Sequence, residues 1–146
     1  MTAIRRATVK WDGDLAKGDG HVSATTSRAF SALPVTWASR TERADGRTSP
    51  EELLAAAHAT CYTMAFSSEL AKAGSPADRL EVSAEVAIDR IDGKWTVISS
   101  KLTVRGRVTG LNNDRFRAIA ELAKDGCPIS RALVGNVAIS LDAALE

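Results

Sequence analysis

Apolar and polar positions follow a definite order along this chain of 146 residues. They alternate over Ala7–Trp11, and the pattern of Val22–Phe30 again suits strands, because successive side chains of a strand point to opposite faces. Turn signals at Asp12-Gly13-Asp14 and Lys17–Gly20 separate these segments, so the chain is expected to open as a β-meander. Ala38–Thr48 is almost entirely polar, which predicts an exposed loop or a loop that lines a site.

A long helix is predicted after this loop. Ser49 can cap it, Pro50 suits its first position, and Glu52 completes a Ser-x-x-Glu capping box. Leu53–Lys72 contains neither glycine nor proline, and Ala73-Gly74 is a natural C-terminal stop. Its many alanines allow other backbone elements to approach closely, so we expect this helix to lie centrally.

Two alternating segments, Leu80–Ile91 and Trp95–Val108, are joined by Asp92-Gly93, which is a strong signal for an antiparallel hairpin. Asn112 or Asn113 is then expected to cap an amphipathic helix. The remaining signals are a stop at Gly126, a short helical turn from Cys127-Pro128 to Leu133, and a last strand over Val137–Leu141. This order of elements predicts an α+β fold, in one continuous domain over residues 1–146.

The charge pattern restricts the partners. The 19 basic and 18 acidic residues are interspersed and give a net charge of +1, so no basic footprint for nucleic acid or for an anionic membrane is present. This favours a small or neutral substrate. The N-terminus has no signal-peptide core, and the most apolar stretch, Leu53–Phe66, is shorter than the ~20 residues of a membrane helix. We therefore expect a cytoplasmic protein.

The chain has two cysteines, Cys61 and Cys127. Two inert buried thiols are the commoner case, and a reducing cytosol keeps such a pair as thiols unless it cycles through a disulfide. Cys61 lies just past the middle of the long helix, where a packing residue is the simpler interpretation. Cys127 lies between Gly126 and Pro128, near the N-terminal end of a new helical turn, where unpaired backbone N–H groups favour a thiolate.

Thiol chemistry needs a cation that lowers the cysteine pKa from about 8.5, because only the thiolate attacks an electrophile. The candidates are Arg40, Arg43, Arg47 and His58. An arginine in this role needs an acidic partner, which Glu51 or Glu52 could supply, although Glu52 has its capping role and Glu51 could simply compensate the helix dipole.

His58 precedes Cys61 by three residues and could act as its base, but a lone histidine in an apolar helix is more often a packing residue. The two cysteines and two distant histidines do not have the spacing of zinc ligands.

Two motifs carry a resemblance to a known family. The segment Thr48–Ala65, TSPEELLAAAHATCYTMA, resembles the central-helix signature of the OsmC/Ohr family, and Gly126–Ser130, GCPIS, resembles its second-cysteine motif. The opening Trp11–Asp14 with Gly18–Gly20, and the Ala-Ala-Ala-His form before the first cysteine, are more similar to the OsmC branch than to Ohr. The likeness spans the whole chain.

The resemblance implies an OsmC-like fold, with antiparallel sheets around two central helices, in an intertwined homodimer with its sites at the interface. It implies reduction of organic hydroperoxides, and less efficiently of hydrogen peroxide, without metal, haem or other cofactor. Cys61 matches the peroxidatic cysteine, Cys127 the resolving cysteine, Glu51 the upstream glutamate and Arg40 the arginine. Arg43 and Arg47 remain rivals of Arg40, because the loop before Pro50 varies in length within the family.

In the implied mechanism the Cys61 thiolate attacks the distal peroxide oxygen, and Arg40 stabilises the developing charge. Cys127 then condenses with the sulfenate, and an external dithiol, such as a lipoylated protein or a small thiol, reduces the disulfide. Ten helical residues place Glu51 about 15 Å along the axis from Cys61. Glu51 therefore serves the site of the partner chain, unless the loop folds Arg40 back along its own helix.

Two other functions compete with this one. The first is a redox-sensing or ligand-binding domain whose cysteines oxidise without turnover. The second is a purely structural dimeric domain, which the joint presence of Cys61, Cys127, Arg40 and Glu51 disfavours.

Overall fold

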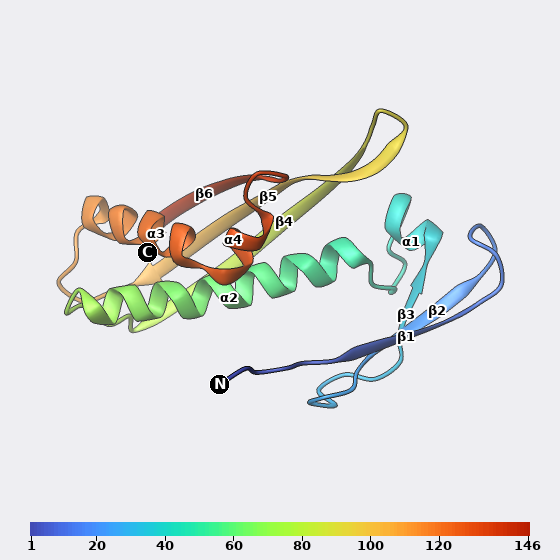
Figure 1. Cartoon of the computed structure of the whole chain (residues 1–146). Helices are drawn as coiled ribbons and strands as arrows, with labels where there is room; N and C mark the ends of the chain where they lie inside the picture. Colours follow the sequence, from blue (N-terminus) through green and yellow to red (C-terminus); the bar gives the residue numbers. More distant parts are fainter. The chain divides into compact units, whose positions relative to one another are not determined.

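The computed structural model describes all residues from 1 to 146, and its contacts group them into two compact units, residues 1–53 and 54–146. Figure 1 shows the helices and strands along the chain. That the whole chain forms one domain stays a prediction.

The first unit contains the expected β-meander. Its strands β1 (Ala7–Asp12), β2 (Asp19–Ala24) and β3 (Leu33–Thr36) form an antiparallel sheet in the order β1-β2-β3. The predicted strand character as far as Phe30 is wrong beyond Ala24. The backbone N–H groups of the next two residues donate to the carbonyl of Arg6, at 3.0 and 3.2 Å, and this contact turns the chain back.

A short helix, α1 (Trp37–Thr41), replaces the first part of the predicted polar loop. The Thr36 hydroxyl accepts a hydrogen bond from the Ser39 backbone N–H at 3.0 Å. The Ser39 hydroxyl in turn accepts one from the Thr36 backbone N–H, also at 3.0 Å. This reciprocal cap uses serine where a capping box usually has glutamate or glutamine, so the usual signature does not reveal it.

The long helix α2 (Pro50–Lys72) begins and ends as predicted. The Ser49 hydroxyl accepts a hydrogen bond from the Glu52 backbone N–H at 3.1 Å. The Glu52 carboxylate does not complete the capping box, however, because it accepts a hydrogen bond from the Thr48 hydroxyl at 2.8 Å instead. Gly74, with φ of +76°, ends the helix in the left-handed conformation that glycine favours.

The second unit contains a mixed sheet of β4 (Arg79–Ile91), β5 (Lys94–Arg107) and β6 (Ala138–Leu145), in the order β4-β5-β6. Asp92 and Gly93 have φ of 50° and 78°, which confirms the hairpin turn. The expectation of antiparallel sheets is wrong for β6, which pairs with β5 in parallel. A parallel pair needs a crossover connection, and two helices between β5 and β6 supply it.

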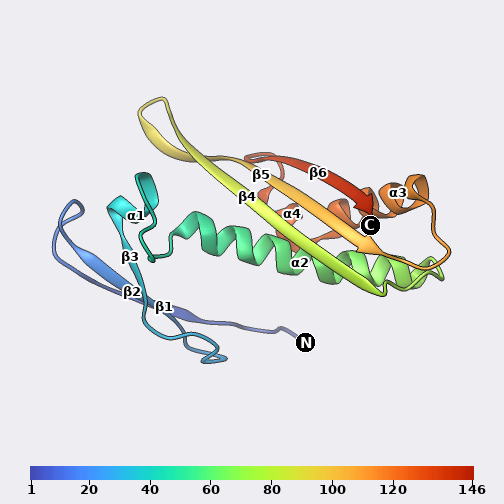
Figure 2. The ribbon, with the colours of Figure 1, turned by 180° about the vertical axis from the view of Figure 1, so that it is seen from behind.

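These two helices are α3 (Asn113–Gly126) and α4 (Pro128–Leu133). Asn112 caps α3 by accepting a hydrogen bond from the Arg115 backbone N–H at 2.9 Å, so the first of the two candidate asparagines is the cap. Cys127 ends α3 and begins α4. Seen from opposite sides in Figures 1 and 2, α2, α3 and α4 lie on one face of the sheet.

Side chains from both long helices form the core of the second unit. Tyr62, Phe66 and Leu70, spaced by four along α2, are fully buried. The rings of Phe66 and Phe116 meet edge to face with centroids 5.0 Å apart. A Cβ at Gly106 of β5 would lie 2.8 Å from two ring carbons of Phe116, so any larger residue here would force neighbouring atoms to shift. Both helices are thus central to this unit, as expected.

Candidate active site

The two cysteines lie side by side in the second unit, although 66 positions separate them in the sequence. Both are free thiols; Cys61 is half-buried on α2, and Cys127 is fully buried at the start of α4. The Cys127 thiol and the backbone N–H of Ile129 both lie near enough to the Cys61 sulfur to influence its pKa. The first residues of α4 therefore form one wall of the Cys61 environment.

The environment of Cys61 favours the thiol over the thiolate. Burial raises the pKa of Cys61, and the adjacent Cys127 thiol raises it further, while the Ile129 backbone N–H lowers it. No lysine or arginine of residues 54–146 is among the groups that shift this pKa. Within residues 54–146 apolar burial dominates, so the depression of the Cys61 pKa by a cation stays a prediction.

Arg40 and Glu51 form a close ion pair in the first unit. The Arg40 Nε lies 3.0 and 3.2 Å from the two Glu51 carboxylate oxygens, and Nη2 lies 2.8 Å from Oε1. Both side chains are largely shielded, at 28% and 10% exposed, and the guanidinium lies 5.6 Å from the centre of the Trp37 ring. Such a two-pronged contact fixes the orientation of the guanidinium plane.

The rival arginines are not held in this way. Arg43 reaches only the exposed Asp45, at 3.7 Å, with 83% of its side chain exposed. Arg47 is exposed and forms no ion pair. Of the three candidates from the sequence, Arg40 is the one that Glu51 orients, and Glu51 does more than compensate the helix dipole.

His58 lies one turn before Cys61 and is fully buried. Its Nδ1 lies 2.7 Å from the Ser100 hydroxyl, and its Nε2 lies 2.8 Å from the Ser130 hydroxyl. Burial lowers the pKa of this imidazole. The expectation that this histidine is buried with its hydrogen bonds satisfied is confirmed. Neither of these hydrogen bonds reaches Cys61, so the contacts of the ring give no support to the alternative role as the base of Cys61.

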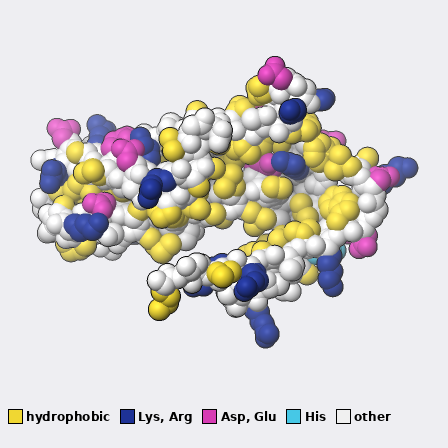
Figure 3. Space-filling model, viewed as in Figure 1, with side chains coloured by type: hydrophobic (Ala, Val, Ile, Leu, Met, Phe, Trp, Pro, Cys, Tyr) yellow, Lys and Arg dark blue, Asp and Glu magenta, His cyan; other side chains and the backbone are white.

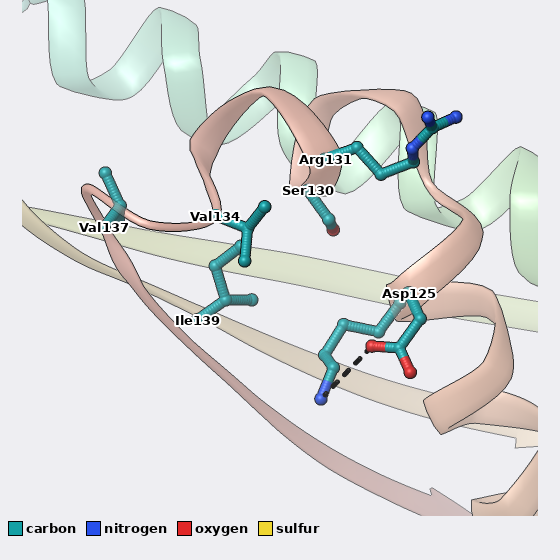
Figure 4. A pocket seen from close by; sticks show the side chains of 7 residues that line it. Asp125, Ser130, Arg131, Val134, Val137 and Ile139 are labelled. Carbon is teal, nitrogen blue, oxygen red and sulfur yellow. Dashed lines mark ion pairs between the residues drawn. The ribbon is translucent and has the colours of Figure 1, made fainter.

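A cavity of about 260 Å³ adjoins the turn that follows Cys127. Figure 4 shows its wall, with Val134 and Ile139 on one side and the Lys124–Asp125 ion pair, 4.0 Å long, on the other. The remaining lining residues are Ser130, Arg131 and Val137. Neither cysteine lines it. No local pattern in the sequence predicts this cavity, because its walls come from α3, α4 and the segment that enters β6.

Comparison with known proteins shows the family of this chain. Residues 43–142 match the family of OsmC-like proteins.

The chain belongs to the OsmC family.

It is 34% identical to Peroxiredoxin OsmC of Escherichia coli K12, over 95% of this chain and 96% of that protein. It is 30% identical to the organic hydroperoxide resistance protein of Xanthomonas axonopodis pv. citri, over 66% of this chain and 67% of that protein. These relatives confirm the resemblance drawn from the motifs and favour the OsmC branch.

Solved structures show the same fold. The organic hydroperoxide resistance protein OhrB of Bacillus subtilis superposes with a TM-score of 0.74 at 23% identity, over 94% of this chain and 97% of that chain. An organic hydroperoxide resistance protein of Elizabethkingia anophelis gives a TM-score of 0.77 at 21% identity, with both chains fully covered. The OsmC-like α+β fold expected from the sequence is therefore confirmed.

Two other kinds of feature are absent from this OsmC-family chain. None of its helices combines the length and apolarity needed to cross a membrane. No group of three or more His, Cys, Asp or Glu side chains is arranged to hold a metal ion.

Proposed function

We propose that this OsmC-family protein reduces organic hydroperoxides, and less efficiently hydrogen peroxide, with Cys61 as the attacking thiol. The observation that carries the proposal is that Cys61 and Cys127, distant in the sequence, lie close together in one hydrophobic core. A peroxidatic cysteine needs a second thiol close enough to trap its oxidised form. The names of two relatives, a peroxiredoxin and an organic hydroperoxide resistance protein, point to the same chemistry.

The reaction proceeds in two steps. The Cys61 thiolate attacks the distal peroxide oxygen, so that an S–O bond forms, the O–O bond breaks and the alkoxide leaves as an alcohol after taking a proton. Cys127 then attacks the Cys61 sulfenic acid, an S–S bond forms, and water leaves. The chain has no third cysteine, so an external dithiol, such as a lipoylated protein, must reduce the disulfide.

The unequal exposure of the two thiols supports these roles. Cys61 is half-buried, which leaves part of it open to a small substrate, whereas Cys127 has no exposed surface. A buried thiol is protected from direct attack by peroxide, yet it is in contact with the sulfur that becomes oxidised. Cys61 therefore attacks and Cys127 resolves, rather than the reverse.

Arg40 is the cation that activates Cys61 in this proposal. Burial raises the Cys61 pKa, so a positive charge has to approach before the thiolate can form at neutral pH. Glu51 occupies Nε and Nη2 of Arg40 and leaves Nη1 free to face an anion. The same N–H group would stabilise the negative charge that develops on the peroxide.

The active form is proposed to be an intertwined homodimer. Among residues 1–53, Val22 is the only hydrophobic side chain that is buried, whereas all six residues of β1 are exposed. Trp11 and Val9 of this strand are 39% and 60% exposed, and Figure 3 shows hydrophobic side chains at the surface. A sheet with an apolar surface of this kind needs a covering layer, which a partner subunit would supply.

Within such a dimer, the Arg40–Glu51 pair of one chain serves Cys61 of the other. Glu51 and Cys61 lie on the same helix α2, and ten residues correspond to about 15 Å along its axis. Two α2 helices that run antiparallel about a two-fold axis would bring each pair to the partner's cysteine.

Steady-state reduction of cumene hydroperoxide with a dithiol as electron donor tests the proposed activity. We expect many turnovers per chain for the wild type and none for Cys61→Ser. If each of several different dithiols is tried and the protein still consumes only one equivalent of hydroperoxide, the result would contradict catalysis and favour a redox sensor.

A further inference from the structure

His58 connects three elements of the second unit. Its ring lies on α2, Ser100 belongs to β5, and Ser130 belongs to α4. The two hydrogen bonds are 2.7 and 2.8 Å long, and all three side chains are buried. A neutral imidazole has one N–H donor and one acceptor nitrogen, so one serine donates to the ring and the other accepts from it.

Helix α4 is attached to the rest of the unit by few polar side-chain contacts. It is only six residues long, and Cys127 at its N-cap makes no side-chain capping hydrogen bond. Ser130 is the one buried residue within this helix, and its hydroxyl is the group that binds His58. The His58–Ser130 bond is therefore the one side-chain hydrogen bond between α4 and α2, and it acts beside the apolar packing of Cys127 and Ile129 against the core.

The bond lies close to both sulfurs. His58 precedes Cys61 by three residues on α2, and Ser130 follows Cys127 by three residues. Residues three apart on a helix lie on one face, so the His58–Ser130 bond is about one turn from each reacting atom. Ile129, whose backbone N–H lowers the pKa of Cys61, is the immediate neighbour of Ser130.

Packing alone does not explain why a polar side chain occupies the buried position of His58. An apolar side chain of similar volume would pack there without the desolvation cost of a buried imidazole and two hydroxyls. The polar arrangement does provide direction, because hydrogen bonds weaken steeply when their angles change.

We propose that His58 is a positioning residue for disulfide formation: its bonds to Ser100 and Ser130 hold α4 so that Cys127 faces Cys61. The inference rests on the proposed disulfide cycle. In the step concerned, the Cys127 sulfur bonds to the Cys61 sulfur, the S–O bond of the sulfenic acid breaks, and hydroxide leaves with the thiol proton as water. A disulfide requires its two Cβ atoms to approach within 3.5–4.5 Å, roughly, so a displaced α4 slows this step.

Four variants test the proposal. Ser130→Ala removes the bond to α4. His58→Asn places its amide near the position of Nδ1, which keeps the contact with Ser100 and loses Ser130. His58→Gln reaches the position of Nε2 and keeps Ser130. Ser100→Ala is the matched control for stability, because it removes a buried hydrogen bond of the same ring without releasing α4 directly.

The readout separates the two chemical steps. After one equivalent of cumene hydroperoxide, a sulfenic-acid probe follows oxidation of Cys61, and mass spectrometry follows the disulfide. We expect disulfide formation, relative to sulfenate formation, to slow on the order of ten- to a hundred-fold in Ser130→Ala and His58→Asn. His58→Gln should restore much of the rate, and Ser100→Ala should have a smaller effect. The long-lived sulfenate should also make the first two variants prone to sulfinic acid at Cys61 under excess peroxide.

A purely structural role would instead lower the unfolding midpoint of all four variants and leave the ratio of the two steps unchanged, which would overturn the proposal. Diamide oxidises a dithiol to a disulfide without peroxide. The rate of its reaction therefore reports formation of the Cys61–Cys127 disulfide independently of the peroxidase step. Equal rates of disulfide formation with diamide in the wild type and Ser130→Ala would also overturn the proposal. Failure of the wild type to form a sulfenate would contradict the proposed peroxidase function. The positioning role of His58 would then be judged from the rates of disulfide formation with diamide.

Discussion

The Arg40 guanidinium binds the Glu51 carboxylate through Nε and Nη2, at 3.0 and 2.8 Å, and keeps Nη1 free of this contact. A bound anion would meet a guanidinium whose plane is already fixed. This arrangement distinguishes Arg40 from Arg43 and Arg47, whose side chains are exposed.

The first prediction concerns this choice. Arg40→Ala should raise the pKa of Cys61 further and slow its reaction with hydroperoxide by about ten-fold or more, because the thiolate loses its cation. The rate of iodoacetamide alkylation against pH measures the thiolate fraction. Arg43→Ala and Arg47→Ala are the matched controls, and a larger pKa change in either would transfer the role to that arginine.

The second prediction concerns the sharing of sites between subunits. Cys61→Ser and Glu51→Ala chains are denatured and refolded together, and hydroperoxide reduction is measured. If Glu51 serves the partner, each heterodimer contains one site with an intact Cys61 and an intact Glu51, so activity should exceed that of either homodimer. If each chain contains its own site, mixing restores no activity, and the shared site must be abandoned.

The third prediction follows from the lowered pKa of His58. In the unfolded chain the imidazole takes up its proton near pH 6.5, roughly, whereas the folded chain binds it only at lower pH. The contribution of neutral His58 to stability is therefore complete above about pH 6.5 and falls as the pH drops below it, by at most about 1.4 kcal/mol per pH unit.

Urea unfolding at several pH values between neutral and acidic measures this contribution. The wild type should lose stability relative to His58→Gln as the pH falls, because the variant has no imidazole to protonate and the other titrating groups cancel in the difference. Parallel curves for the two proteins would show that His58 does not titrate differently in the folded chain.

The fourth prediction concerns the close contact between β5 and α3. A Cβ at Gly106 would lie 2.8 Å from Phe116 and 2.9 Å from Leu80, so Gly106→Ala should destabilise the fold by about 1–3 kcal/mol through overpacking. Gly126→Ala is the control, because a Cβ there meets no atom within 4 Å and alanine favours a helix. Urea unfolding at neutral pH compares the two, and equal midpoints would argue against a tight strand–helix contact.

Local signals account for what the sequence predicted correctly. The Ser49 cap, the Gly74 stop and the Asp92-Gly93 turn each act within a few residues, so α2 and the long hairpin follow from their own sequences. The motifs around Cys61 and Cys127 predicted the family correctly. The family resemblance in turn implied that the two cysteines act together, and the structure places them close to each other.

Contacts between distant residues account for what the sequence did not predict. The serines that bind His58 lie 42 and 72 positions away, and no local pattern specifies them. The parallel pairing of β6 depends on how α3 and α4 carry the chain back across the sheet. The raised pKa of Cys61 depends on burial and on Cys127, which lies 66 positions away in the sequence.

The most direct test of the account is a single turnover with one equivalent of cumene hydroperoxide, followed by mass spectrometry and a sulfenic-acid probe. The wild type should form a disulfide between Cys61 and Cys127 of one chain. Cys127→Ser should stop at a Cys61 sulfenate that the probe traps, and Cys61→Ser should leave the peroxide unreduced. Identical behaviour of the two variants, or a disulfide found only between chains, would contradict the roles assigned to the two thiols.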